Sequence, residues 1–120
     1  MPKKALIIDD EEALTEIIVE VLSTLDFESY PAISGEDAIK IANQNDHFDL
    51  IIIDMNMPGM NGEETYNNIK TGFSDTPLIF MSGYDLSEEM AAMNLKCPNI
   101  FLKKPFTIAD LTKTVSQLLP

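Results

Sequence analysis

The chain has 120 residues, of which 45% are hydrophobic, so it is long enough for one domain with a buried core and too short for a second. A formal net charge of −12, with eight lysines and no arginine, argues against a direct nucleic-acid partner, because the surface would repel phosphate backbones. No apolar stretch approaches the roughly 20 residues of a membrane helix, and the Met-Pro-Lys-Lys start is not typical of a signal peptide. The single cysteine, Cys97, excludes an intrachain disulfide, and we expect it to be a packing residue in a cytoplasmic protein without membrane insertion.

The first half of the chain alternates between strand and helix patterns. A short apolar run at 5–8 predicts a buried parallel strand. The helix expected next carries one apolar stripe, formed by Leu14, Ile17, Ile18, Val21, Leu22 and Leu25. A weaker strand pattern at 28–32 and a helix at 35–44 follow, and the apolar run at 50–53 predicts another buried strand.

The alternation continues through the second half. A helix is expected at 63–71, a buried strand at 78–81 and a further helix at 86–94. A weaker strand pattern at 100–102 precedes the last helix, whose apolar stripe comprises Ile108, Leu111, Val115 and Leu118. The two weaker strands, at 28–32 and 100–102, are expected at the edges of the sheet.

Three of the helices have a capping pattern at their expected start, in which a side chain that can cap precedes an acid by three residues. The pairs are Ser34 with Asp37, Asp85 with Glu88, and Thr107 with Asp110. These pairs agree with the helix boundaries that the apolar periods predict.

Five strands that alternate with five helices in so short a chain predict an α/β domain over residues 1–120. Right-handed crossovers place helices on both faces of a parallel sheet, so we expect a doubly wound sandwich with strand order 2-1-3-4-5. In that order the first and third strands are neighbours, and ligands bind outside their carboxyl ends. The functional residues are therefore expected at this edge.

Acidic residues follow the two neighbouring strands. The first strand ends in Asp9-Asp10-Glu11 and the third ends in Asp54, so the topology brings Asp9, Asp10 and Asp54 together. Such a cluster is unfavourable without a counter-charge, and a hard divalent cation such as Mg²⁺ would supply one. Alternatively, Asp9 and Asp10 cap the following helix and Asp54 begins a turn.

Two further strand ends carry complementary groups. Ser82 follows the fourth strand and Lys104 follows the fifth, which places a hydroxyl and an ammonium at the same edge. Together with a metal ion, these groups are what a phosphoryl group on a carboxylate requires. Ser82 could instead belong to a simple turn with Gly83, and Lys104 could only neutralise the acids.

These residues belong to a set of motifs by which the chain resembles a known family over essentially its whole length. Its motifs are Asp9-Asp10, Asp54 followed by Met57-Pro58 and Gly62, Ser82-Gly83, and Lys104-Pro105-Phe106. In order and spacing they are similar to the motifs of the response regulator receiver domain, in particular its single-domain, chemotaxis-regulator-like form. The resemblance implies the flavodoxin-like fold of that family. The resemblance implies a phosphorylation-dependent switch of a two-component system or phosphorelay.

The resemblance also implies a role for each site residue. Asp54 would be the phosphoacceptor, and Ser82 and Lys104 would contact the phosphoryl oxygens. Mg²⁺, or Mn²⁺ in its place, would be bound by Asp10, Asp54 and the backbone carbonyl of Asn56. Asp9 would act on the metal largely through water.

Further implications concern switching and partners. Phe101 occupies the family's switch-aromatic position, and Tyr84, two residues beyond Ser82, could shield the acyl phosphate from water. The Lys104–Pro105 peptide bond is usually cis in the family. A histidine kinase or histidine phosphotransfer protein would donate the phosphoryl group, and the fourth helix, fifth strand and fifth helix would bind the downstream target.

Three other functions compete with this one. A receiver-fold interaction domain that is not phosphorylated is the main alternative, although such domains usually lack one of the acids or the lysine. A haloacid-dehalogenase-type phosphatase needs a second acid two residues after its nucleophile, where this chain has Asn56. A flavin-binding protein would need a Ser/Thr-Gly phosphate loop after the first strand, and the sequence has none there.

His47 is expected to be a surface histidine and not a phosphodonor. The domain is expected to be a switch without a diffusing substrate.

Overall fold

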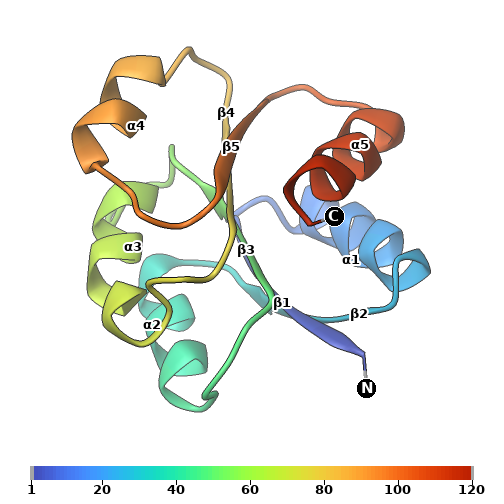
Figure 1. Ribbon diagram of the computed structural model, residues 1–120, viewed down its shortest axis with the longest axis horizontal. Coiled ribbons are helices and arrows are strands. Elements are labelled where there is room, and N and C mark those ends of the chain that lie inside the picture. The colour runs from blue at the N-terminus through green and yellow to red at the C-terminus, as the bar shows by residue number, and fades with distance from the viewer. Residues whose placement is uncertain (1, 120) are drawn as a thin grey trace.

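The computed structural model describes residues 2–119, and it has five parallel strands in the order β2-β1-β3-β4-β5. The strands are β1 (Lys3–Ile8), β2 (Phe27–Ala32), β3 (Leu50–Asp54), β4 (Leu78–Ser82) and β5 (Asn99–Lys103). The helices are α1 (Glu12–Thr24), α2 (Gly35–Asn43), α3 (Gly62–Ile69), α4 (Ser87–Met93) and α5 (Ile108–Leu118), with a short 3-10 helix, η1 (Lys70–Gly72), after α3. Figure 1 shows α1 and α5 on one side of the sheet and α2, α3 and α4 on the other. The predicted fold class and strand order are confirmed.

The core forms two layers because successive side chains of a strand point to opposite faces of the sheet. In β3, Ile51 and Ile53 belong to a buried cluster that includes residues of α2 and α3. Ile52, between them, belongs to a second cluster with residues of α1 and α5. All five residues of β3 are buried, and so are all five of β4. This double burial explains why the central strands are continuous apolar runs.

Two residues of the predicted helix stripes are exposed. Ile17 is 45% exposed, because α1 buries a stripe centred on Ile18 and the next position along a helix is turned by about 100°. Ile108 is 62% exposed as the first residue of α5, one turn ahead of the buried Leu111. The assignment of these two isoleucines to the buried faces was therefore wrong.

Two of the three predicted capping residues are confirmed. Ser34 and Thr107 each accept a hydrogen bond from the backbone N–H three residues later, and Thr107 forms a reciprocal capping box with Asp110. The Asp85 prediction was wrong: its carboxylate accepts from the backbone N–H of Ser87, two residues on, so Leu86 occupies the N-cap position of α4.

One further helix cap was not predicted from the sequence. Asn61 and Glu64 form a capping box at the start of α3, the helix that follows the Asp54 loop. A helix that begins at a fixed residue holds the loop before it in place. This cap therefore helps to position the end of β3.

Gly62 is the point at which α3 contacts the end of β3. A Cβ atom at this position would lie 2.5 Å from the backbone oxygen of Asp54 and 2.7 Å from the Cα of Met55. Because both contacts are with backbone or Cα atoms, no side-chain rotation could relieve them. Only glycine allows this close approach of the helix to the strand.

We expect Gly62→Ala to lower the free energy of unfolding by about 2 kcal/mol, because the added methyl group must push α3 away from β3. Gly72→Ala is the matched control, since nothing lies within 4 Å of a Cβ atom there, and it should change stability by less than about 0.5 kcal/mol. Urea denaturation of both variants measures the difference. Equal stability of Gly62→Ala and the wild type would show that the helix approach is not close.

Candidate functional site

The predicted functional residues meet at the carboxyl edge of the sheet. Asp9 follows β1, Asp54 is the last residue of β3, Ser82 is the last residue of β4, and Lys104 follows β5. Asp9, Asp54 and Ser82 are buried, although each is polar. The parallel topology accounts for their convergence, because the carboxyl ends of all five strands lie at one edge.

Lys104 is the centre of the site. Its Nζ lies 3.0 Å from Asp9 Oδ2, 3.2 Å from Asp54 Oδ2 and 3.1 Å from Glu11 Oε1. The Asp9 side chain is fully buried and that of Asp54 is nearly so, whereas Glu11 is exposed. One ammonium is therefore shared by two buried carboxylates and contacts a third at the surface.

The charges of the site shift two pKa values. Burial opposes the charge on Lys104, but the hydrogen bond and negative charge of Asp9, together with Asp54 and Glu11, raise the pKa of the lysine above its ordinary value. Burial raises the pKa of Asp9, and the charge of Asp54 adds to this effect, while the Glu11 N–H and Lys104 oppose it. The three carboxylates around Lys104 therefore carry more negative charge than its single positive charge can balance.

The acids are arranged so that a cation could bind between them. Carboxylate oxygens of Asp9, Glu11 and Asp54 lie within 4.8 Å of one another. Oxygen ligands of this kind suit hard divalent cations such as Mg²⁺. The residues present therefore fit a metal ion at this place.

The membership of this acidic cluster differs in one residue from the sequence analysis. Glu11 belongs to it, and the predicted ligand Asp10 does not, since Asp10 is exposed at the start of the loop. The Glu11 backbone N–H donates to Asp9 Oδ1 over 2.9 Å, which brings the third acid of the Asp9-Asp10-Glu11 run back over the site. That run of three acids was the available sequence signal. Metal ligation by Asp10 stays a prediction.

Ser82 is held by Asn56, a contact that the sequence analysis did not identify. The Ser82 hydroxyl donates a hydrogen bond to Asn56 Oδ1 and accepts one from the Tyr84 backbone N–H over 3.1 Å. The Asn56 backbone N–H donates in turn to Asp54 Oδ1 over 3.0 Å. Asn56 therefore connects the carboxylate of β3 with the hydroxyl of β4.

The two residues predicted to take part in switching differ in burial. Phe101 pairs with Phe80 across β5 and β4, and its half-buried ring packs against the core on the side of α2 and α3. Tyr84 is 70% exposed just beyond β4. The Lys104–Pro105 peptide bond is cis, as the resemblance implied.

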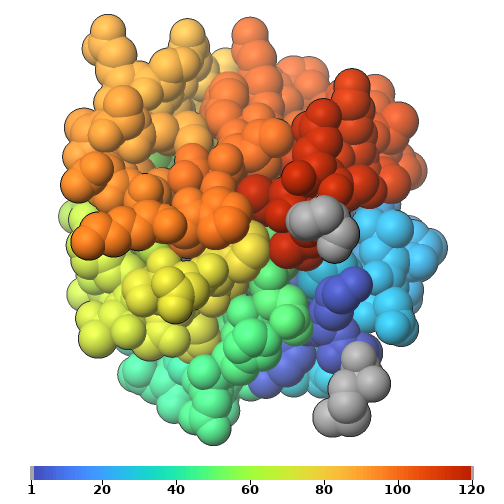
Figure 2. All heavy atoms as spheres, viewed as in Figure 1, coloured from blue at the N-terminus to red at the C-terminus, as the bar shows by residue number. Residues whose placement is uncertain are grey.

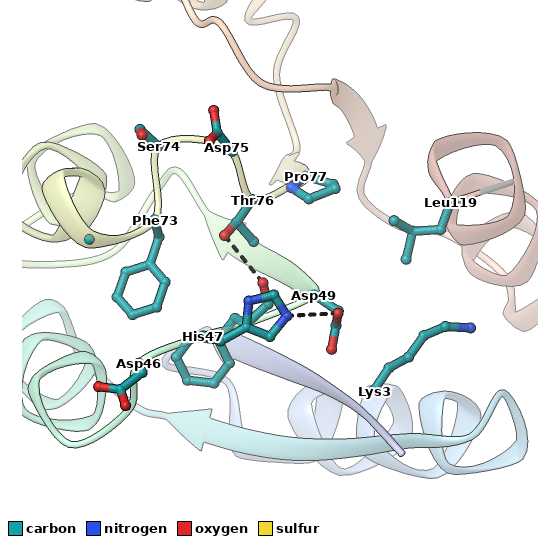
Figure 3. Close-up of a pocket in the computed structure, with 12 residues that line it drawn as sticks. Lys3, Asp46, His47, Asp49, Phe73, Ser74, Asp75, Thr76, Pro77 and Leu119 are labelled. Atoms are coloured by element: carbon teal, nitrogen blue, oxygen red, sulfur yellow. Dashed lines mark hydrogen bonds and ion pairs between the residues drawn. The ribbon is translucent and has the colours of Figure 1, made fainter. Parts of the chain in front are cut away.

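A pocket of about 490 Å³ lies at the opposite, amino-terminal edge of the sheet, away from Asp54. The loops before β3 and β4 line it, together with Lys3 and Leu119 (Figure 3), and these segments meet in the lower centre of Figure 2. His47 is exposed here, with its Nε2 2.9 Å from Asp49 Oδ1. The expected surface histidine is confirmed, and it has no contact with the acidic cluster.

Two smaller expectations concern Cys97 and membranes. Cys97 is a buried free cysteine whose Sγ lies 3.9 Å from the Tyr66 hydroxyl, as expected of a packing residue. Burial is the main cause that raises the pKa of Tyr66. Within residues 2–119, no helix combines the length and apolar character that crossing a membrane requires.

A match to a protein-family model identifies the family of this chain. The model of the response regulator receiver domain matches residues 5–116. The chain belongs to this family. The receiver domain is similar to part of the autoinducer 1 sensor kinase/phosphatase LuxN of Vibrio harveyi, with 33% identity over 114 residues, which are 95% of this chain but only 13% of LuxN.

Solved structures agree with the family assignment. The chemotaxis protein CheY4 of Vibrio cholerae is similar with a TM-score of 0.87 and 25% identity, over 99% of this chain and 100% of that one. The response regulator TrrA of Thermotoga maritima, in complex with Mg²⁺-BeF, has a TM-score of 0.80 and 28% identity, over 98% and 99% of the two chains. The resemblance to single-domain, chemotaxis-type receivers is confirmed.

Receiver domains are signalling modules of two-component systems and phosphorelays, and they act as phosphorylation-dependent switches. They bind Mg²⁺ at an acidic site, and this receiver domain has an acidic cluster of Asp9, Glu11 and Asp54 around Lys104. The proteins it is similar to include receivers of kinases and phosphotransferases. The predicted class of function is therefore confirmed.

Proposed function

We propose that Asp54 accepts a phosphoryl group from a phosphohistidine of a histidine kinase or histidine phosphotransfer protein. The observation that carries the proposal is the convergence of Asp54, Lys104 and Ser82 at one edge, with Lys104 Nζ 3.2 Å from Asp54 Oδ2. A carboxylate, an ammonium and a hydroxyl are the nucleophile and the two donors that phosphoryl transfer needs. Incubation with acetyl phosphate and Mg²⁺, followed by intact-mass analysis, tests it.

In the transfer, an oxygen of Asp54 attacks phosphorus, and the bond between phosphorus and the donor's imidazole nitrogen breaks. The imidazole leaves with the bonding electron pair. Lys104 exchanges part of its contact with Asp9 and Asp54 for a phosphoryl oxygen, and its charge stabilises the transferring group. The Ser82 hydroxyl donates a hydrogen bond to another phosphoryl oxygen. The phosphoryl group on Asp54 would thus be held by one ammonium and one hydroxyl.

We assign metal binding to Asp9, Asp10, Asp54 and the backbone carbonyl of Asn56, with Glu11 as a further candidate. A bound Mg²⁺, or Mn²⁺ in its place, would neutralise phosphoryl oxygens and the acidic cluster. The carboxylate oxygens of Asp9, Glu11 and Asp54 within 4.8 Å of one another support this assignment. Asp10, an exposed residue in the loop after β1, lies outside that group of oxygens.

Phosphorylation would be read by a partner at the surface of α4, β5 and α5. When Ser82 moves toward the phosphoryl group, Phe101 can follow into the space beside it and change that surface. Support comes from β5, where Phe101 lies half-buried beside β4, the strand that ends in Ser82. The downstream target would be a protein and not a nucleic acid, because the chain carries a net charge of −12.

We place the receiver domain in the cytoplasm, where the free thiol of Cys97 would stay reduced. A receiver-fold interaction domain without phosphorylation remains the alternative function. The sequence does not favour it, since the acids, the hydroxyl and the lysine are all present.

Tyr84 should control how long the phosphoryl group lasts. Its ring is 70% exposed and its N–H is bonded to Ser82 Oγ, so the ring is free to lean over a phosphoryl group at Asp54 and restrict the attacking water. We expect Tyr84→Ala to speed loss of phosphate about threefold, on the modest scale expected for water exclusion. Intact-mass analysis at intervals after removal of the donor measures the rate.

Tyr84→Phe is the matched control and should keep the wild-type rate, because shielding depends on the ring and not on its hydroxyl. An unchanged or slower rate in Tyr84→Ala would remove the shielding role. A rate that rises equally in both variants would point to the hydroxyl instead.

A further inference from the structure

The single hydroxyl proton of Ser82 is already engaged in a hydrogen bond to Asn56. The Ser82 hydroxyl donates to Asn56 Oδ1, while its oxygen accepts from the Tyr84 backbone N–H. A serine hydroxyl can donate only one hydrogen bond at a time. The contact with Asn56 and a contact with a phosphoryl oxygen therefore exclude each other.

Asn56 is placed so that its contact with Ser82 depends on the phosphoacceptor. It lies two residues after Asp54, and its backbone N–H donates to Asp54 Oδ1 over 3.0 Å. Its side chain reaches from this loop to the end of β4, where Ser82 is fully buried. The amide thus satisfies a buried hydroxyl that has little access to water.

We propose that the Asn56 side chain is a positioning residue that holds the Ser82 hydroxyl in its resting orientation and so opposes the phosphorylated state. The proposal rests on the proposed function of Asp54. Phosphorylation breaks the contact between Asn56 and Ser82, and the exposed Asn56 amide is then solvated. The resting contact therefore weakens binding of a phosphoryl group without touching that group.

The size of the effect follows from the energy of one hydrogen bond. A neutral intramolecular hydrogen bond contributes a net free energy of about 1 kcal/mol, which corresponds to about fivefold in an equilibrium constant. Asn56→Ala removes this contribution from the resting state only, and it keeps the backbone carbonyl and the backbone N–H of residue 56. The variant should bind a phosphoryl mimic about fivefold more tightly.

Beryllofluoride with Mg²⁺ is the probe, and its dissociation constant is measured by titration of the amide resonances of Gly83 and Tyr84. We expect about fivefold tighter binding by Asn56→Ala than by wild type. Before any probe is added, the Gly83 and Tyr84 resonances of the variant should already be displaced toward their probe-bound positions. A purely structural role of Asn56 would not move them in that direction.

Two controls make the result specific. Asn67→Ala removes an exposed asparagine from α3 and should leave the affinity unchanged. In a Ser82→Ala background, where no hydroxyl is present, Asn56→Ala should have no effect on affinity, because the coupling runs through that hydroxyl.

The outcomes separate the two proposals. If the wild type does not bind beryllofluoride with Mg²⁺, the proposed function fails and the positioning role fails with it. If the wild type binds but Asn56→Ala binds no more tightly, only the positioning role is overturned. The same holds if Asn56→Ala has an equal effect with and without the Ser82 hydroxyl.

Discussion

Asp54→Asn is expected to abolish labelling by acetyl phosphate in the presence of Mg²⁺. Asparagine has the same size and keeps an oxygen that can accept from the Asn56 N–H, so the loop geometry should survive. An amide is not a nucleophile at neutral pH, and removal of a nucleophile lowers reaction rates by orders of magnitude. Intact-mass analysis should show one added phosphoryl group on the wild type and none on the variant.

Asp75→Asn is the matched control for this result. Asp75 is an exposed acid in the loop before β4, where it lines the pocket at the opposite edge of the sheet from Asp54. It should be labelled as fast as the wild type, and a chelator should prevent labelling of both. Equal labelling of wild type and Asp54→Asn would reject Asp54 as the phosphoacceptor.

The fold could be predicted from the sequence because burial leaves a direct pattern. Strands β3 and β4 are buried on both faces, so nearly all their residues must be apolar, and only Asp54 and Ser82 at their ends are polar. Alternation with helices then restricts the topology to very few arrangements. The exposed Ile17 shows the limit, because an apolar residue at the border of a helix face does not report which side it takes.

The strand-end residues of the site were predictable for the same reason. The carboxyl ends of the four strands that end in, or are directly followed by, Asp9, Asp54, Ser82 and Lys104 must share one edge. The convergence of these residues therefore needs no knowledge of side-chain conformation. A cluster of buried acids also breaks the usual rule that buried polar groups are neutral or fully paired, and such exceptions concentrate at functional sites.

The contacts made by Glu11 and Asn56 could not be predicted in this way. Glu11 reaches Lys104 only because the chain turns back after β1, and Asn56 reaches Ser82 through one particular side-chain orientation. Both depend on rotamers and loop geometry that leave no periodic pattern in the sequence. The start of α4 was missed for a related reason, since Asp85 satisfies a local turn in place of the helix end.

Lys104→Met should destabilise the metal-free receiver domain by about 3 kcal/mol. Methionine keeps most of the apolar stem of the lysine, so the change removes mainly the charge. The fully buried Asp9 and the nearly buried Asp54 then lose their shared cation, and a buried carboxylate left without a partner typically costs about 3–5 kcal/mol. Urea unfolding in the presence of a chelator measures the loss.

Lys103→Met is the matched control, because this neighbouring lysine is exposed at the end of β5 and its removal should change stability by less than about 0.5 kcal/mol. Adding Asp54→Asn to Lys104→Met should recover part of the loss, since one of the two unpaired carboxylates is gone.

The pH and metal dependence of the loss provide the decisive test. Burial raises the pKa of Asp9 above its ordinary value of 3.8, and losing Lys104 raises it further. A carboxyl group with a raised folded-state pKa destabilises the fold above that pKa, and the penalty is relieved as the pH falls through it toward 3.8. The deficit of Lys104→Met should therefore be greatest at neutral pH and shrink on acidification. Excess Mg²⁺ should reduce the deficit at neutral pH, because the acidic cluster without the Lys104 charge binds the dication more tightly than the wild-type cluster does and is stabilised more by it. A deficit below about 1 kcal/mol at neutral pH in chelator, or one that grows as the pH falls, would mean that Asp9 and Asp54 do not depend on Lys104 for their charge balance.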